Sequence, residues 1–151
     1  MLGDVDEDKV SFYRTSTRRH TLNSEFDVSA VKELPKVEIV YSYVEPNTAI
    51  IQALVASGVK GIVYAGAGAG VLSSFEKSAL KAVLSLPIES RPVLVRSSRV
   101  GNGRVIARDE YDAMGMIPAD TVNPQKARIL LMLARTRTND PKEIKRMFAE
   151  Y

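Results

Sequence analysis

The sequence predicts a small three-layer α/β domain, in which a parallel sheet of about four strands is flanked by helices. Apolar runs rich in β-branched residues alternate with amphipathic patterns of helical spacing, and capping residues separate them. The apolar run at residues 61–65 also leads directly into Gly66, Gly68 and Gly70. A parallel strand that ends in glycine exposes its backbone at the carboxyl edge of the sheet, where open α/β folds bind ligands. We therefore expect a ligand crevice at this turn.

The first two strands are expected at residues 37–43 and 61–65. Residues 37–43 form a β-branched and aromatic run, which suits a strand buried in a parallel sheet. Between the two strands, Asn47 is expected to cap a helix that continues through Ala56. Gly58 then supplies the left-handed residue that ends this helix.

A second helix and a third strand follow the glycine turn. Ser73 and Glu76 have the spacing of a capping box, in which each side chain accepts a hydrogen bond from the backbone of the other. The apolar face of this helix is expected to consist of Ala79, Leu80, Val83 and Leu84. The apolar run at residues 92–96 then predicts the third strand.

A long polar segment, from Ser97 to about Val122, follows the third strand. Glycines and Pro118 are expected to interrupt any regular element there, and a loop of this length in a compact domain is often functional. The segment is therefore a second place to look for site residues.

Two helices are expected at the C-terminal end of the chain. Asn123 caps the first of them, and Pro124 takes its first helical position. Its inward face is expected to hold Ile129, Leu130 and Leu133. Asp140 repeats the cap for the last helix. The apolar residues of that helix are Ile144, Met147, Phe148 and Tyr151.

The composition excludes several kinds of chemistry. The chain has no cysteine, which excludes disulfides, thiolate catalysis and cysteine-ligated zinc, and neither a metal nor a cofactor is expected. The single histidine, His20, lies in a polar run and is expected to be a solvated loop residue rather than a catalytic base. The net charge of +3 is small, and the basic residues are not interleaved with aromatic ones, so no nucleic-acid partner is expected.

The sequence predicts neither a membrane span nor an export signal. A span needs about 18 consecutive apolar residues, and the sequence contains no such run. The N-terminus is acidic, whereas a signal peptide begins with positive charge. The sequence therefore leaves the location open; as written, without an export signal, the chain would be cytoplasmic, and no membrane partner is expected.

Residues 1–35 differ from the rest of the chain. Residues 10–14 could form one strand, but the surrounding sequence is polar and has neither helical nor alternating periodicity. A lone strand is unstable because its backbone groups need hydrogen-bonding partners. We therefore interpret this segment as a linker that carries a strand whose partner is missing.

Eight short motifs, from about residue 10 to the C-terminus, connect the chain to a known family. They are Tyr13-Arg14-Thr15, Arg19-His20-Thr21, Phe26-Asp27-Val28-Ser29, Leu34-Pro35-Lys36-Val37, Gly61-Ile62-Val63-Tyr64-Ala65-Gly66, Val95-Arg96-Ser97-Ser98-Arg99, Asn123-Pro124-Gln125-Lys126-Ala127-Arg128 and Asp140-Pro141. In their order and spacing they resemble the C-terminal part of bacterial-type (type II) L-asparaginases and glutaminase-asparaginases. The resemblance implies that residues 36–151 form the smaller C-terminal α/β domain of this family. Residues 1–35 would be a remnant of the last N-terminal-domain strand and the interdomain linker.

The resemblance also implies that this chain holds no catalytic residue. In the family, a threonine in an N-terminal glycine-rich loop attacks the amide of the substrate, and a Thr-Asp pair and a lysine complete the catalytic set. None of these motifs is matched here. The C-terminal domain instead contributes substrate binding across a dimer. The expected substrate is L-asparagine, or L-glutamine, only when an N-terminal domain is present, and the expected protein partner is a second copy or a full-length asparaginase.

The implied substrate-binding residues are Glu110, Gly70 and Val71. Glu110 would bind the ammonium group of an asparagine presented by the neighbouring subunit. Asp109 is the register-shifted alternative, and a solvated loop carboxylate with no ligand is the other. The family usually has Asn or Ser where this chain has Val71, and valine cannot form a side-chain hydrogen bond. Ser73 is a weaker substitute because its capping role already explains it.

The main hypothesis is that the chain is the C-terminal portion of an L-asparaginase and is inactive alone. Other interpretations of the sequence remain open at this point. One is a nucleotide-binding domain, although a dinucleotide fingerprint needs its third glycine at position 71, which is Val71. Another is a non-catalytic assembly module that binds itself or a full-length paralogue. A wrongly assigned start of the gene, in which Met1 is an internal methionine, is a further interpretation.

Overall fold

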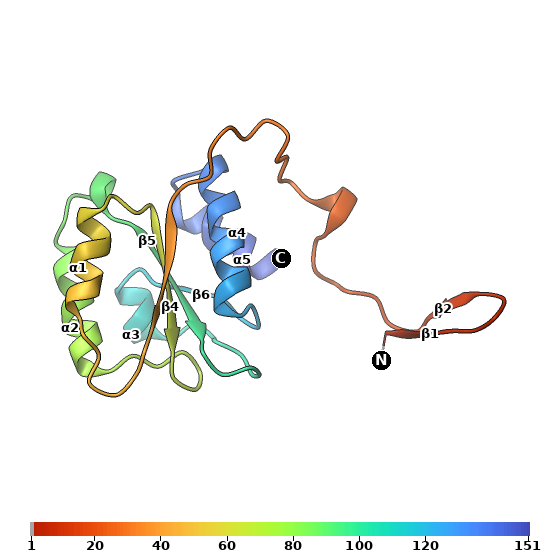
Figure 1. The fold of residues 1–151 in the computed structure, drawn as a ribbon, viewed down its shortest axis with the longest axis horizontal. Coiled ribbons are helices and arrows are strands. Elements are labelled where there is room, and N and C mark those ends of the chain that lie inside the picture. Colours follow the sequence, from red (N-terminus) through yellow and green to blue (C-terminus); the bar gives the residue numbers. More distant parts are fainter. Residues whose placement is uncertain (1) are drawn as a thin grey trace.

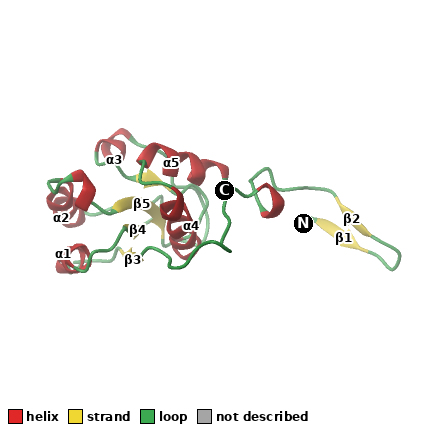
Figure 2. Cartoon of the chain, turned by 90° about the horizontal axis from the view of Figure 1, so that it is seen from above, coloured by secondary structure: helices red, strands yellow, loops and turns green. Residues whose placement is uncertain are grey.

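A parallel sheet of four strands in the order β3-β4-β5-β6 lies at the centre of the computed structural model, which describes residues 2–151. Its strands are β3 (Val37–Tyr41), β4 (Gly61–Gly66), β5 (Val93–Ser98) and β6 (Ile117–Pro118). Helices α1 (Ala49–Ala56) and α2 (Ser74–Leu84) cover one face, and α4 (Pro124–Arg137) and α5 (Pro141–Glu150) cover the other (Figures 1 and 2). The predicted three-layer α/β fold is confirmed.

Two hydrophobic cores, one on each face, result from the alternation of side chains along the strands. Ile62, Tyr64 and Leu94 pack with α1, α2 and the short helix α3 (Asp109–Ala113). Val63 and Val95, which alternate with them, pack with α4 and α5. All six residues of β4 are buried, as expected for a strand covered on both faces.

The caps of three helices are formed as predicted. The Ser73 hydroxyl accepts a hydrogen bond from the Glu76 N–H, and the Glu76 carboxylate accepts one from the Ser73 N–H, which completes the capping box of α2. The Asn123 side chain accepts from the Lys126 N–H at the start of α4, and Asp140 caps α5 in the same way. Since each cap involves only neighbours in the sequence, the local pattern was sufficient to predict it.

The start of α1 differs by one residue from the prediction. Thr48 occupies the N-cap position, while the Asn47 side chain accepts a hydrogen bond from the Ala49 N–H at 3.1 Å. Gly58 has φ +77° and follows the end of α1, as predicted.

Two elements occur within residues 97–122, where a continuous loop was predicted, so that prediction was wrong. Helix α3 has five residues, and its Tyr111 is almost completely buried. Strand β6 has only two residues and pairs with β5 at the edge of the sheet, where Pro118 is tolerated. Both elements depend on contacts that are remote in the sequence, which explains why no local periodicity revealed them.

The inward face of α4 was predicted only in part, since of the three residues named only the half-buried Leu130 packs against the core on this side of the sheet. Ile129 is 51% exposed, whereas Ala127, Leu131 and Ala134 are buried against the sheet. A Cβ atom on Gly61 would lie 2.6 Å from Leu131 Cδ2, so the Leu131 side chain fills the space above Gly61. The face of α4 that carries Leu131 therefore lies against the sheet, and Ile129 is at the surface.

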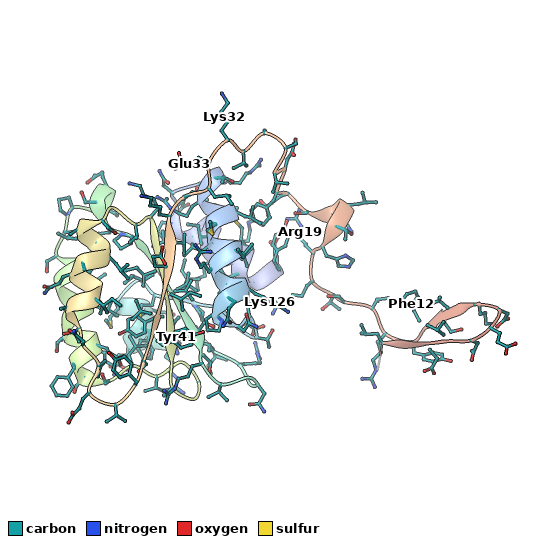
Figure 3. All side chains as sticks on the ribbon, in the orientation of Figure 1. Phe12, Arg19, Lys32, Glu33, Tyr41 and Lys126 are labelled. Atoms are coloured by element: carbon teal, nitrogen blue, oxygen red, sulfur yellow. The ribbon has the colours of Figure 1, made fainter. Side chains whose placement is uncertain are left out.

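The predicted lone strand does have a partner in this chain. β2 (Val10–Phe12) pairs antiparallel with β1 (Gly3–Val5), which corrects the expectation that its partner is missing. We call residues 2–14 the arm; Figure 1 shows that it extends away from the α/β domain. Figure 3 shows Phe12 on the arm, well separated from Lys126 on α4.

The segment after the arm is attached to the C-terminal helix. The Arg18 guanidinium donates to the carbonyl of Ala149 at 2.6 Å, and the Arg19 N–H donates to the carbonyl of Glu150 at 2.8 Å. The Tyr151 hydroxyl accepts from the Glu25 N–H at 2.7 Å. Residues 18–26 are thereby held against α5.

Candidate functional site

The glycine turn is a tight fold-back of the chain at the carboxyl edge of β4. Ala67 and Val71 exchange two backbone hydrogen bonds of 3.0 and 2.7 Å across it. Gly68 and Gly70 have φ values of +50° and +76°, which favour glycine. A Cβ atom on Gly66 would lie 2.5 Å from the carbonyl carbon of Gly70. The glycines are therefore required by the turn itself.

This geometry does not support the nucleotide alternative. A dinucleotide fold binds pyrophosphate at the N-terminus of the helix that follows the glycines. In this chain the N-terminus of α2 holds the buried Glu76 carboxylate, which accepts from the Ser73 N–H at 2.6 Å and from the Ser42 hydroxyl at 3.0 Å. An anion at this position would be repelled by the carboxylate.

Arg96 connects the turn to the segment that precedes α3. Its guanidinium is buried and donates to the carbonyl oxygens of Ala69, at 2.9 Å, and Gly70, at 3.3 Å. It also donates to the carbonyl of Ile106 and lies 4.1 Å from the centroid of the Tyr111 ring. Sequence reasoning missed this role, although an arginine inside the apolar run 92–96 was a visible signal.

Tyr111 connects α3 to the end of the turn. The Tyr111 hydroxyl accepts a hydrogen bond of 3.1 Å from the backbone N–H of Leu72, the residue after Val71. Glu110, the residue before Tyr111 on α3, lines a surface cavity with Ser74 and Lys77 of α2, and neither Gly70 nor Val71 lines that cavity. Val71 is 41% exposed and has no polar side-chain atom.

The Glu110 carboxylate already has a cationic partner. Its side chain is 56% exposed, and Oε1 lies 2.5 Å from the Nζ atom of Lys77 on α2. This hydrogen bond raises the pKa of Lys77 above its ordinary value. Asp109 is also exposed, but it forms no ion pair within residues 2–151. Lys77 was not identified from the sequence.

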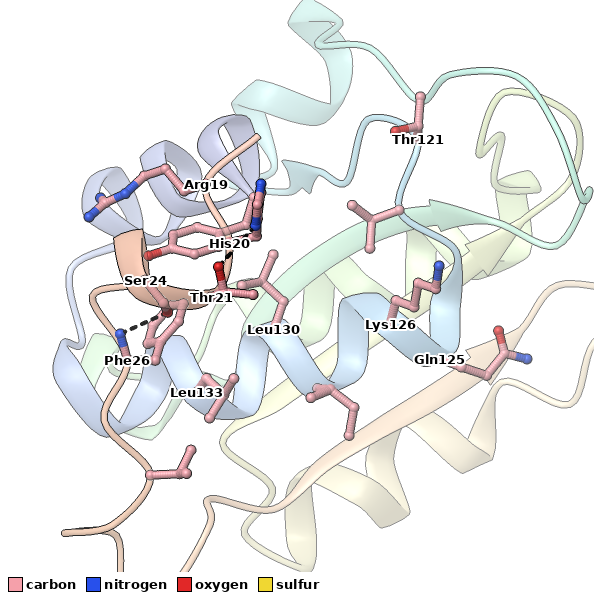
Figure 4. Close-up of a pocket in the computed structure, with 14 residues that line it drawn as sticks. Arg19, His20, Thr21, Ser24, Phe26, Thr121, Gln125, Lys126, Leu130 and Leu133 are labelled. Carbon is pink, nitrogen blue, oxygen red and sulfur yellow. Dashed lines mark hydrogen bonds between the residues drawn. The ribbon is translucent and has the colours of Figure 1, made fainter. Parts of the chain in front are cut away.

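The remaining predicted feature, His20, lies elsewhere. It is exposed, its Nδ1 atom is 3.1 Å from the Thr21 hydroxyl, and it lines a surface cavity beside α4 (Figure 4). At the sheet edge, no hydroxyl of the described residues is hydrogen-bonded to a lysine or histidine side chain. The described residues also contain no cluster of acidic or histidine side chains suited to a metal ion. None of the helices among them is both long and apolar enough to cross a membrane.

The fold thus defines a class: an α/β domain with a parallel sheet, a closed glycine turn after β4 and an exposed carboxylate on α3. Residues 36–148 match the family model described as the glutaminase/asparaginase C-terminal domain, and the chain belongs to this family. The match covers the sheet and all five α-helices, apart from the last two residues of α5.

Individual relatives agree with this assignment. The chain is 43% identical over 145 residues to "L-asparaginase 2" of Bacillus subtilis, and 42% identical over 154 residues to "L-asparaginase 2" of Escherichia coli. A crystal structure of a "Probable Cytoplasmic L-asparaginase" from Campylobacter jejuni matches it with a TM-score of 0.88 and 44% identity over 99% of this chain. The matches span only 37%, 42% and 47% of these three proteins, so the chain corresponds to their C-terminal domain.

Proposed function

We propose that this chain supplies the substrate-binding half of an L-asparaginase active site, which an N-terminal domain completes. Together the two domains would hydrolyse L-asparagine to L-aspartate and ammonia, or L-glutamine to L-glutamate and ammonia. The observation that supports the proposal is the exposed Glu110 carboxylate on α3, a helix that the Tyr111 hydroxyl connects to the residue after the glycine turn. A carboxylate of this kind binds the ammonium group of an amino-acid substrate through a charge-assisted hydrogen bond.

Two observations bear on substrate binding in this proposal. The Lys77 ammonium bonds Oε1 of Glu110, so a substrate ammonium would use the other carboxylate oxygen or compete with Lys77. Val71 offers no side-chain hydrogen bond, and its N–H is already donated to Ala67. Affinity for the α-amino group therefore depends on Glu110.

The test is ammonia release by this chain fused to the N-terminal domain of the Bacillus subtilis relative. We expect no release from the 151-residue chain alone and measurable release from the fusion. Glu110→Gln in the fusion should raise KM at least tenfold, because a charge-assisted bond of about 1.5 kcal/mol or more is lost. Asp109→Asn, the matched control, should change KM little. Ammonia release by the chain alone, or an unchanged KM for Glu110→Gln, would contradict the proposal.

A second candidate function is assembly without catalysis, through association with a second copy or with a full-length asparaginase. The specific observation in its favour is the exposed arm, whose large apolar side chains have no partner in the α/β domain. A cytoplasmic location stays a prediction, since the relatives include proteins named both cytoplasmic and periplasmic.

A further inference from the structure

The segment that joins β5 to α3 carries an Asn-Gly pair that the proposed hydrolysis does not use. Asn102 and Gly103 are exposed and lie in a bend between Ser98, the last residue of β5, and Val105. A Cβ atom on Gly103 would have no atom within 4 Å apart from its chain neighbours, so the space around the pair is open. Water and hydroxide therefore reach both residues.

An asparagine that precedes glycine can lose its side-chain amide without an enzyme. The main-chain nitrogen of the glycine loses its proton and attacks the side-chain carbonyl carbon of the asparagine, which closes a five-membered succinimide ring and expels ammonia. Water then opens the ring at either of its two carbonyl groups and leaves aspartate or isoaspartate. Glycine favours the attack because it has no Cβ atom to crowd its nitrogen. In total, one water is consumed and one ammonia is released.

Both reacting groups of this pair are unrestrained. Neither the side-chain amide of Asn102 nor the main-chain N–H of Gly103 forms a hydrogen bond within residues 2–151. The Val100 N–H donates to the Ser98 hydroxyl at 3.0 Å, but this bond precedes the pair. The Gly103 nitrogen therefore reaches the Asn102 side chain without the loss of a hydrogen bond.

Four other asparagines occur in the chain, and in two of them the side chain itself is held. The Asn47 side chain accepts a hydrogen bond from the Ala49 N–H at 3.1 Å. The Asn139 side chain accepts one from the Arg135 guanidinium. Each of these bonds must break before the side-chain carbon can turn toward the following nitrogen.

In the other two asparagines the attacking nitrogen is blocked. Asn123 precedes Pro124, whose nitrogen carries no proton, and its side chain also caps α4. Asn23 precedes Ser24, whose N–H donates to the carbonyl of Thr21 at 3.0 Å. Asn102 thus differs from all four in its local geometry as well as in the residue that follows it.

We propose that Asn102 is a site of spontaneous deamidation, and that it converts before every other asparagine of the folded chain. The product carries a carboxylate, which lowers the formal net charge of +3 by one. Isoaspartate also routes the main chain through the former side chain and lengthens it by one carbon between β5 and α3. The reaction involves neither Glu110 nor an N-terminal domain, so it stands or falls separately from the hydrolytic function.

The change should remain local, because the backbone is fixed on both sides of the pair. The Arg99 N–H donates to the carbonyl of Gly66 at 3.0 Å. Val105 exchanges two backbone hydrogen bonds with Asp120, at 2.9 and 3.2 Å. We therefore expect the deamidated chain to stay folded, with an unchanged midpoint in urea.

The first test is peptide mapping by mass spectrometry after incubation of the 151-residue chain at neutral and at mildly alkaline pH. We expect the mass shift of an amide-to-acid conversion at Asn102 first, and faster at the higher pH because the attack needs loss of the Gly103 amide proton. Ammonia should appear in the same molar amount as the modified chain, whereas turnover of added asparagine has no such ceiling. Asn102→Gln should remove the signal, since glutamine must close a larger ring. Asn47 is the internal control, and its amide should persist.

The second test separates the structural restraint from the preference for glycine. In urea, Asn23 and Asn47 should begin to convert, because the hydrogen bonds that restrain them are lost. Asn102 should convert there no faster than in the folded chain. Two results would overturn the proposal: an Asn102 amide that persists in the folded chain but is lost in urea, or conversion of another asparagine before Asn102 in the folded chain.

Discussion

Replacement of Arg96 by methionine should separate the glycine turn from α3. The buried guanidinium donates to the carbonyl groups of Ala69, Gly70 and Ile106. Methionine fills much of the same space but donates no hydrogen bond, so three carbonyl groups lose their partner. A buried polar group left without a partner costs about 1–3 kcal/mol, and water can recover part of this loss at the edge of the sheet. We therefore expect the free energy of unfolding to fall by about 3 kcal/mol.

A loss of this size is a large part of the stability of a domain, which is about 5–15 kcal/mol. It should be visible in urea unfolding followed by far-ultraviolet circular dichroism, as a lower midpoint with an unchanged slope. Amide exchange should localise the effect. Protection should fall first at the Val71 and Leu72 amides, which close the turn and join it to Tyr111.

The matched control is Arg91→Met, since the exposed Arg91 donates to one carbonyl, that of Leu86. Arg91→Met should lower the free energy of unfolding by less than about 1 kcal/mol. Arg96→Lys should lower it by an intermediate amount, because lysine keeps the charge but not the planar arrangement of donors. Equal losses for Arg96→Met and Arg91→Met, or unchanged protection of the turn, would refute the role assigned to Arg96.

Three further substitutions test the rest of the fold. Gly61→Ala should lower the free energy of unfolding by about 1–3 kcal/mol, because its Cβ would meet Leu131, and a normal thermal midpoint would contradict this close contact. Ser73→Ala should cost about 1 kcal/mol in urea unfolding through loss of the α2 cap, and no loss would argue against the capping box. Hydrogen bonding to Arg146 lowers the pKa of Glu25, so the ionised carboxylate stabilises the fold above its ordinary pKa of 4.5, and this contribution is lost as the pH falls through the lowered value. Glu25→Gln should therefore be less stable than the natural chain at neutral pH, with a difference that disappears in acid; a difference that persists there would contradict this explanation.

Local patterns in the sequence predicted those parts of the fold that local contacts determine. The caps at Ser73, Asn123 and Asp140 involve residues at most three positions away, and all three were predicted. Helix α3 was missed because it has only five residues and is held by Tyr111, which contacts a residue 39 positions earlier. The orientation of α4 was predicted only in part for a similar reason. Its Leu131 packs over Gly61, 70 positions earlier, and hydropathy alone cannot reveal that contact.

The candidate site was predictable only in part. The glycine turn was visible as a strand that runs into glycines, and Glu110 was named through the family resemblance rather than from any pattern of its own. The side chains that organise the site, Arg96 and Tyr111, bond to backbone atoms far along the chain. Such contacts leave no periodic signal in the sequence, apart from a charged residue within an apolar strand.

The structure changes the interpretation of the glycine turn. Gly66, Gly68 and Gly70 suggested a turn whose backbone could approach a ligand, but its geometry shows the backbone closing on itself. The rigid turn instead serves as an anchor: Arg96 fixes one side of it and the Tyr111 hydroxyl the other, and α3 is positioned as a result. The backbone of α3 is thus held through Tyr111 and Arg96, while the Glu110 carboxylate itself pairs with Lys77. Substitutions in the turn should therefore shift α3, and Glu110 with it.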